Sequence, residues 1–268
     1  MERLFSPTSF LLCTLFLAFS PGPAFAAGTF AIPPDYTAVY KVMYKGDELA
    51  GVTIQLSHQD KAWTLHGYTH DMQGLADLLK VKGIQTVTGH WQDGSFKPDN
   101  YDFSFSLVGY KSVWQANFDW PEGIVTTSGK SGNVQLPLTG GAFDPFSLSL
   151  NVGSLLEQGQ KQIEVNIIDE DKLQNHLYQV ELVEPVDTAM GCLQTTRVKR
   201  IRKKKSKRTS LAWYANDYSY IPVQMQHFKK NGKGISMQII GLEVEGRPIQ
   251  AVASCITNSV EARQAGPG

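Results

Sequence analysis

The sequence predicts a mostly β protein with antiparallel strands and one or two short helices. Apolar residues recur at every second position in short runs bounded by Gly, Pro, Asn and Asp, the pattern of half-buried strands. Spacing typical of a helix occurs in only two segments. The chain has 268 residues, enough for one large β domain or two small ones. In antiparallel sheets such alternation puts one strand face against a core and the other in water.

The N-terminus has the three parts of a secretory signal peptide. Arg3 supplies a positive charge, residues 10–19 form an apolar run, and Ala24-Phe25-Ala26 predicts cleavage after Ala26. The apolar run is shorter than the roughly 20 residues that span a bilayer. We therefore expect a cleaved signal peptide at 1–26, a soluble antiparallel β domain at 27–258 and a disordered tail at 259–268.

The strand pattern is clearest in a predicted hairpin with an aromatic face. Two alternating runs lie on either side of a predicted turn near Gly109, as the two strands of a hairpin do. Their aromatic and apolar members are Tyr101, Phe103, Phe105, Leu107, Trp114, Ala116, Phe118 and Trp120. The same period appears before them at Val52, Ile54 and Leu56. It returns in four later runs, around Ile163, Tyr178, Ile221 and Ile235.

The aromatic face of this hairpin has two interpretations. Its members are Phe103, Phe105, Trp114, Phe118 and Trp120. Such residues suit the apolar wall of a ligand cavity. Ordinary core packing needs the same residues, because burying each contributes ~2 kcal/mol without any ligand. Both interpretations stay open on the sequence alone.

Two segments have helical spacing. Met72, Leu75, Leu78 and Leu79 follow Asp71, which we expect to be the N-cap residue. Asp144-Pro145 pairs a capping residue with a proline suited to the first helical position, although 147–152 also alternates like a strand. We interpret Gly140-Gly141, just before this segment, as a boundary between two sub-sheets.

The cysteines permit one disulfide. Removal of the signal peptide discards Cys13 and leaves Cys192 and Cys255. An exported protein meets an oxidising compartment, so these two can pair, but no spacing rule requires it.

Charge is balanced overall, with 25 basic and 25 acidic residues, yet nine of the twelve residues from Arg197 to Arg208 are Lys or Arg. We expect this run to end one strand, turn near Lys205-Ser206 and start the next, giving a basic hairpin. Its central residues are Arg202, Lys203, Lys204, Lys205, Lys207 and Arg208. The hairpin either contacts an anionic envelope surface or partner, at about 1 kcal/mol per residue near a membrane, or is simply solvated and deters edge pairing.

Several short patterns together resemble the domain of unknown function 3108 family of exported bacterial proteins. The distinctive one is Trp213-Tyr214-Ala215-Asn216-Asp217 leading to Tyr220-Ile221-Pro222-Val223; Lys97-Pro98-Asp99 and Asp144-Pro145-Phe146 support it. The resemblance covers about residues 36–244. It implies a periplasmic protein with a single curved antiparallel sheet, or half-barrel, similar to outer-membrane lipoprotein carriers, wrapping an apolar cavity. It supplies no catalytic residue.

Within the distinctive segment, Trp213, Asp217, Tyr220 and Pro222 are best interpreted as a structural corner. Asn216-Asp217 and Pro222 suit a turn that enters a strand, and we expect Asp217 to accept bonds from nearby backbone amides.

No catalytic motif, cofactor motif or metal site is evident. His66 and His70 can share a strand face, but no third ligand is placed beside them. Gly129-Lys130-Ser131 lacks the spacing of a phosphate loop, and no glycine-flanked nucleophile elbow is present. Export makes a nucleic-acid partner improbable.

Three functional hypotheses follow, in order. The first is a periplasmic, non-enzymatic protein that binds an apolar or lipid-like ligand in the sheet concavity. The second is an envelope scaffold that uses the basic hairpin. The third is an enzyme whose residues come together from distant strands.

Overall fold

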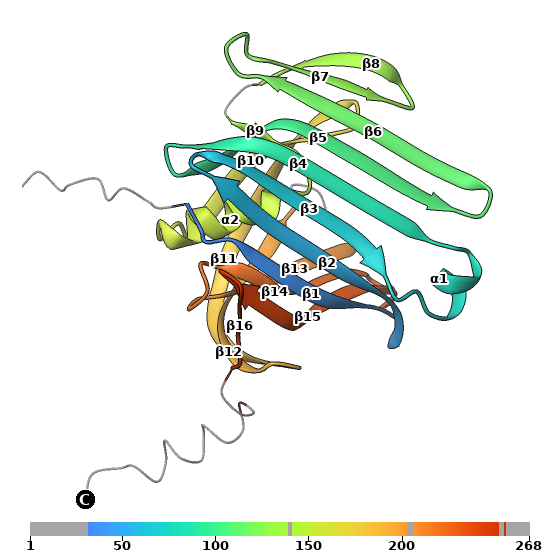
Figure 1. Ribbon diagram of the computed structural model, residues 1–268, viewed down its shortest axis with the longest axis vertical. Helices are drawn as coiled ribbons and strands as arrows, with labels where there is room; N and C mark the ends of the chain where they lie inside the picture. Colours follow the sequence, from blue (N-terminus) through green and yellow to red (C-terminus); the bar gives the residue numbers. More distant parts are fainter. Residues whose placement is uncertain (1–31, 139–140, 203–205, 252–254, 256–268) are drawn as a thin grey trace, which may run out of the picture.

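The computed structural model describes residues 32–138, 141–202, 206–251 and Cys255 as one curved sheet with two helices (Figure 1). All pairings in the sheet are antiparallel except that of β9 with β10. The predicted signal peptide and C-terminal tail lie outside these residues, as do Lys203, Lys204 and Lys205. The strands are β1 (Tyr36–Tyr44), β2 (Asp47–Gln59), β3 (Ala62–His70), β4 (Lys82–Gln92), β5 (Ser95–Leu107), β6 (Tyr110–Asp119), β7 (Ile124–Gly129), β8 (Gly132–Pro137), β9 (Ala142–Phe143), β10 (Gln162–Asp169), β11 (Lys172–Thr188), β12 (Gly191–Ile201), β13 (Arg208–Ala215), β14 (Ile221–Lys229), β15 (Gly234–Val244) and β16 (Arg247–Pro248). The helices are α1 (Gly74–Leu78) and α2 (Leu148–Glu157).

The chain fills the sheet from the centre to one edge and then from the other edge back to the centre. The strand order is β8-β7-β6-β5-β4-β3-β2-β1-β15-β14-β13-β12-β11-β10-β9, and β16 pairs with β15. The segment around Gly141 carries the chain from one edge to the other. The prediction that Gly140-Gly141 separates two sub-sheets is wrong, because pairing of β1 with β15 joins both halves into one sheet.

The predicted strands and the aromatic hairpin are confirmed. β5 and β6 pair antiparallel with Phe103 opposite Trp114, and Gly109 takes the positive φ of 74° that the turn requires. Register shifts interrupt the β1–β2, β4–β5, β11–β12 and β13–β14 pairings. Such bulges increase local twist and bending, which accounts for the curvature of so large a sheet.

Helix α2 lies inside the curve of the sheet and packs against β5, β10 and β14 (Figure 1). It begins at Leu148, so the expectation that Pro145 is its first residue is wrong. Asp144 is fully buried and instead holds the turn ahead of the helix, because its carboxylate accepts the backbone N–H groups of Phe146 and Ser147, each at 2.8 Å.

Hydrogen bonds fix α2 to the β4–β5 turn. Asn151 Oδ1 accepts the N–H of Phe96 at 2.9 Å, and Asn151 Nδ2 donates to the Phe96 carbonyl at 3.0 Å. Ser154 Oγ donates to the Gly94 carbonyl at 2.6 Å. Gly67 on β3 leaves room for Phe146, two residues before the helix, since a Cβ at Gly67 would lie 2.6 Å from the Phe146 ring. Hydrogen bonds to the β4–β5 turn and the fit of Phe146 over Gly67 on β3 therefore fix the position of α2.

Helix α1 is short and exposed. It begins at Gly74 after Gln73, so the prediction that Asp71 caps it is wrong; Asp71 adopts a φ of 48° in the preceding turn. Leu75 and Leu78 are 64% and 72% exposed, and only Ala76 is buried. No helix in the described ranges is sufficiently long and hydrophobic to traverse a membrane.

Buried side chains form two clusters, and both include residues of α2. The larger one contains residues from β1–β7, from β10 and from β12–β15, together with Leu150 of the helix; Tyr40, Trp63, Phe96 and Tyr101 are among its largest members. The smaller one joins Val152 and Leu156 of the helix to β10, β12 and β13.

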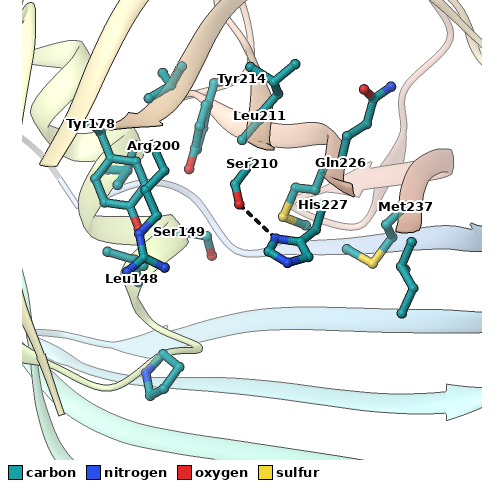
Figure 2. Close-up of a pocket in the computed structure, with 16 residues that line it drawn as sticks. Leu148, Ser149, Tyr178, Arg200, Ser210, Leu211, Tyr214, Gln226, His227 and Met237 are labelled. Carbon is teal, nitrogen blue, oxygen red and sulfur yellow. Dashed lines mark hydrogen bonds between the residues drawn. The ribbon is translucent and has the colours of Figure 1, made fainter. Parts of the chain in front are cut away.

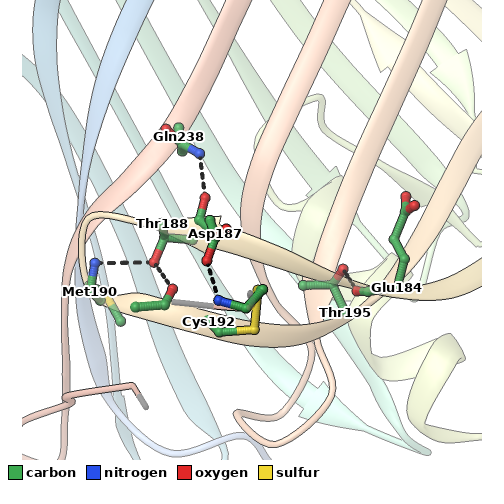
Figure 3. The surroundings of a disulfide bond; sticks show 9 residues. Glu184, Asp187, Thr188, Met190, Cys192, Thr195 and Gln238 are labelled. Atoms are coloured by element: carbon green, nitrogen blue, oxygen red, sulfur yellow. Dashed lines mark hydrogen bonds between the residues drawn. A yellow bond between two sulfur atoms is a disulfide. The ribbon is translucent and has the colours of Figure 1, made fainter. Parts of the chain in front are cut away.

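Cys192 and Cys255 form a disulfide in the structure (Figure 3). The backbone N–H of Cys255 donates to Asp187 Oδ1 at 2.7 Å, and Gln238 Nε2 donates to the Asp187 carbonyl at 3.0 Å. Ala251 N donates to the Met190 carbonyl at 3.0 Å. The segment after β16 is thereby joined to the β11–β12 hairpin.

Candidate functional site

An apolar groove remains in the concavity between the start of α2 and strands β11–β15. It has a volume of about 320 Å³. The groove is lined mainly by carbon and sulfur atoms of Leu148, Val152, Tyr178, Val198, Leu211, Ala212, Tyr214, Met225, Ile235 and Met237. Polar residues on its lining are Ser149, Arg200, Ser210, Gln226 and His227 (Figure 2). Apolar walls with a few polar groups are typical of small-molecule sites.

The two-residue period of β12 divides its basic residues between two faces. Arg197 lies on one face and donates to Glu181 at 2.9 Å and to Glu184 at 3.0 Å, while Lys199 pairs with Glu181 at 3.3 Å. Arg200, two residues beyond buried Val198, lies on the groove face. One face of the strand is therefore neutralised by carboxylates, and the other carries its positive charge to the groove.

A chain of hydrogen bonds forms the mouth of the groove. Arg202 Nη2 donates to Ser210 Oγ at 2.9 Å, and Ser210 Oγ lies 2.8 Å from His227 Nδ1 (Figure 2 shows the second contact). Burial and the charges of Arg202, Arg208, Arg200 and Lys229 lower the pKa of His227. Burial and the charge of Arg200 likewise lower the pKa of Arg202. These shifts mark a strongly positive potential at the mouth.

His176 on β11 lies in the same positive field, and its titration gives a testable pH dependence. Burial, followed by the charges of Arg200 and Arg202, lowers its pKa to about 4. A folded-state pKa below the unfolded value of about 6.5 means that the unfolded chain binds the extra proton, so the free energy of unfolding rises between pH 4 and pH 6.5. We expect His176→Gln to remove no more than about 3 kcal/mol of this rise.

Urea titrations at several pH values between these limits measure the effect. His58→Gln is the control, because His58 is another partly buried histidine but lies on β2. An unchanged pH profile in His176→Gln would show that His176 does not titrate as assigned.

The five aromatic residues of the β5–β6 hairpin lie outside this groove. Trp114 and Phe118 are buried in the larger core cluster, and Phe103 and Trp120 pack against it. Trp120 Nε1 also donates to the Pro98 carbonyl at 2.7 Å. Phe103 and Trp114 border a second, more polar depression on β4–β7 of about 570 Å³. The ligand-wall interpretation of Phe103, Phe105, Trp114, Phe118 and Trp120 stays a prediction.

The Trp213–Pro222 segment forms a corner between β13 and β14. Trp213 Nε1 donates to Glu184 Oε1 at 2.8 Å, and the Pro222 carbonyl accepts from the hydroxyl of Tyr40 at 2.7 Å. Tyr220 takes a φ of 52°. Asp217 is exposed and has no hydrogen bond within the described part of the chain, so its expected role in the turn is wrong. The amides of Tyr218 and Tyr220 donate instead to the Ala215 carbonyl.

The strands that flank the basic hairpin end and begin as expected, at Ile201 and Arg208. Lys207 and Arg208 are exposed, and Arg202 is half-buried. Lys203, Lys204 and Lys205 of the basic hairpin lie outside the described residues, so contact of this hairpin with a membrane or a partner stays a prediction.

Ser210 and His227 are a pair that sequence reasoning missed. A serine–histidine pair suggests nucleophilic catalysis, which requires a third group that orients the histidine and stabilises its charge. Within the described residues, the His227 ring is hydrogen-bonded to Ser210 and is paired with no carboxylate. Among these residues, the pair therefore has no acid partner to complete a Ser–His–acid triad.

Fold and groove together define an open half-barrel with an internal helix and an apolar groove. A sequence profile of the family described as protein of unknown function (DUF3108) matches residues 39–239. The chain belongs to this family. Comparison with curated proteins gave no match.

A solved structure supports the fold. A β-barrel-like protein of domain of unknown function DUF1849 from Brucella abortus is 12% identical, with a TM-score of 0.53 over 80% of this chain and 99% of that chain. A putative lipoprotein from Parabacteroides distasonis is 11% identical, with a TM-score of 0.29 over 80% and 97%. A putative outer membrane lipoprotein-sorting protein domain from Vibrio parahaemolyticus is 11% identical, with a TM-score of 0.20 over 79% and 86%.

Proposed function

We propose that this protein is exported to the periplasm and acts there as a non-enzymatic binding protein for a lipid-like ligand. The ligand occupies the groove between α2 and strands β11–β15. The observation that carries this proposal is the apolar lining of the groove, in which Met225 and Met237 face Leu148 and Val152 of the helix. Its volume of about 320 Å³ falls at the lower end of the range of about 300–1,000 Å³ for ligand pockets.

The position of α2 supports the same function. The helix is fixed by Asn151 and Ser154 to the β4–β5 turn, so the groove is preformed in the folded protein. A preformed apolar site binds a ligand without the cost of ordering its own walls. The expected export route, through the predicted signal peptide at 1–26, would bring the protein to lipids of the cell envelope.

Filling the groove tests the proposal. We expect Ala212→Phe to weaken binding of dodecanol, an uncharged amphiphile, about tenfold or more, because the new ring occupies space that the alkyl chain needs. Isothermal titration calorimetry measures the affinity, and native mass spectrometry of the purified wild type looks for co-purified lipid.

Ala62→Phe is the matched control, since Ala62 is exposed at the start of β3 and far from the groove residues in the sheet order. Equal affinity in the wild type and Ala212→Phe would place the ligand elsewhere. Absence of both dodecanol binding and co-purified lipid would refute the proposed function.

A further inference from the structure

The cations at the mouth of the groove identify the chemistry of the ligand. Arg200 lies on the groove lining, and Arg202 follows directly after the end of the same strand at Ile201. Across the described residues, neither arginine forms an ion pair with a carboxylate. Arg202 is held by neutral partners, Ser210 Oγ and the Arg208 carbonyl, the latter at 3.2 Å.

Neighbouring Arg197, unlike Arg200 and Arg202, has carboxylate partners that neutralise its charge. It is bonded to two glutamates, Glu181 and Glu184, on the other face of the same strand. Carboxylates are therefore provided for the basic residues that face away from the groove and are missing at its mouth. Partly buried cations without counter-ions are costly, so their retention beside an apolar groove favours an anion supplied by a ligand.

The arginine side chain suits this role. A guanidinium group binds carboxylate and phosphate oxygens through two parallel N–H donors, and these charge-assisted bonds are stronger than those between neutral groups. The alkyl part of such a ligand fits the apolar wall formed by Val198, Met225 and Met237. Figure 2 shows Arg200 beside Tyr178 on one side of the lining and Met237 on the other.

We infer that the ligand is an anionic amphiphile, with its alkyl chain in the groove and its carboxylate or phosphate head on Arg200 and Arg202. This inference rests on the proposed function and narrows it to one ligand class. It also assigns the groove-facing part of the basic run to ligand recognition.

The test compares four ligands with the same alkyl chain: lauric acid, monododecyl phosphate, dodecanol and dodecylamine. We expect the wild-type protein to bind one or both anions about tenfold or more tightly than dodecanol, and dodecylamine more weakly than dodecanol. A difference between the carboxylate and the phosphate identifies the preferred head group. Calorimetry below the micelle-forming concentration supplies the affinities.

Arg200→Gln should reduce the preference for the two anions over dodecanol to less than about threefold, because anion binding loses its charged partner. Lys199→Gln is the matched control, because it removes the same charge from the adjacent residue on the opposite face and should keep the preference. Arg202→Gln is a second variant with the same expected result, and it serves if Arg200→Gln fails to fold.

Two results would overturn the inference while leaving the proposed function intact. One is equal binding of all four ligands by the wild type. The other is an equal loss of anion preference in Lys199→Gln and Arg200→Gln, which would show recognition by net charge alone. Failure of all four ligands to bind a folded wild-type protein would instead refute the proposed function itself.

Discussion

We expect Asn151→Ala to lower the free energy of unfolding by about 3–5 kcal/mol, because it leaves two buried backbone groups without partners. Asn151 is 2% exposed. Its side chain accepts the Phe96 N–H and donates to the Phe96 carbonyl. Each unsatisfied buried group costs about 1–3 kcal/mol.

Urea denaturation monitored by tryptophan fluorescence measures this loss. Asn117→Ala is the matched control, since Asn117 is exposed on β6 and bonds only to the side chain of Asn100, at 2.9 Å. The control should change stability by less than about 0.5 kcal/mol. A similarly small change in Asn151→Ala would mean that α2 is not fixed to the β4–β5 turn through this residue.

The second large effect concerns the disulfide. Cys192 and Cys255 are separated by 63 positions in the sequence. In the chain-entropy treatment, a cross-link over such a loop stabilises the folded protein by about 4 kcal/mol, because it restricts the unfolded chain. We expect the double variant Cys192→Ser, Cys255→Ser to lose about this amount relative to the oxidised wild type.

Denaturation of the oxidised wild type, the reduced wild type and the double variant measures the effect. The reduced protein should match the double variant. Peptide mapping without reductant should first show that the two cysteines are linked. If the disulfide is present in the oxidised wild type and all three forms are equally stable, the expected contribution of the disulfide to the free energy of unfolding is contradicted.

Much of the fold follows from alternating residues. The hairpin of β5 and β6 is predictable because apolar residues recur at every second position in both strands, and its turn contains Gly109. The two sets are Tyr101, Phe103 and Phe105, then Trp114, Ala116 and Phe118. The prediction of export rests on the signal-peptide pattern, and the prediction of a half-barrel rests on the family resemblance. Pairing of β1 with β15 was not predictable, because strands some 200 positions apart carry no local signal of their contact.

The helices show the limits of local capping rules. Asp144 is a capping residue by type, yet its carboxylate holds a turn that precedes α2, and the helix starts three residues after Pro145. The start is set instead by tertiary contacts, since Asn151 must reach Phe96 and Phe146 must fit over Gly67. Neither contact is encoded in the helix segment itself.

The groove was missed for a similar reason. Its walls come from a helix and five strands, and residues such as Tyr178, Val198 and Met237 alternate like any half-buried strand. The aromatic residues of β5 and β6 instead made that hairpin the predicted wall of a ligand cavity. The one available signal was the strand period in the basic run, which separates Arg200 and Arg202 from Arg197 and Lys199.

The most direct test of ligand binding in the groove uses the methionine methyl groups. Met225 and Met237 line the groove, whereas Met72 precedes α1 and Met190 lies in the β11–β12 turn. In methyl NMR spectra of isotope-labelled protein, addition of dodecanol should shift the signals of Met225 and Met237 and leave those of Met72 and Met190 in place. Binding of dodecanol with unmoved Met225 and Met237 signals would contradict a ligand site between α2 and strands β11–β15.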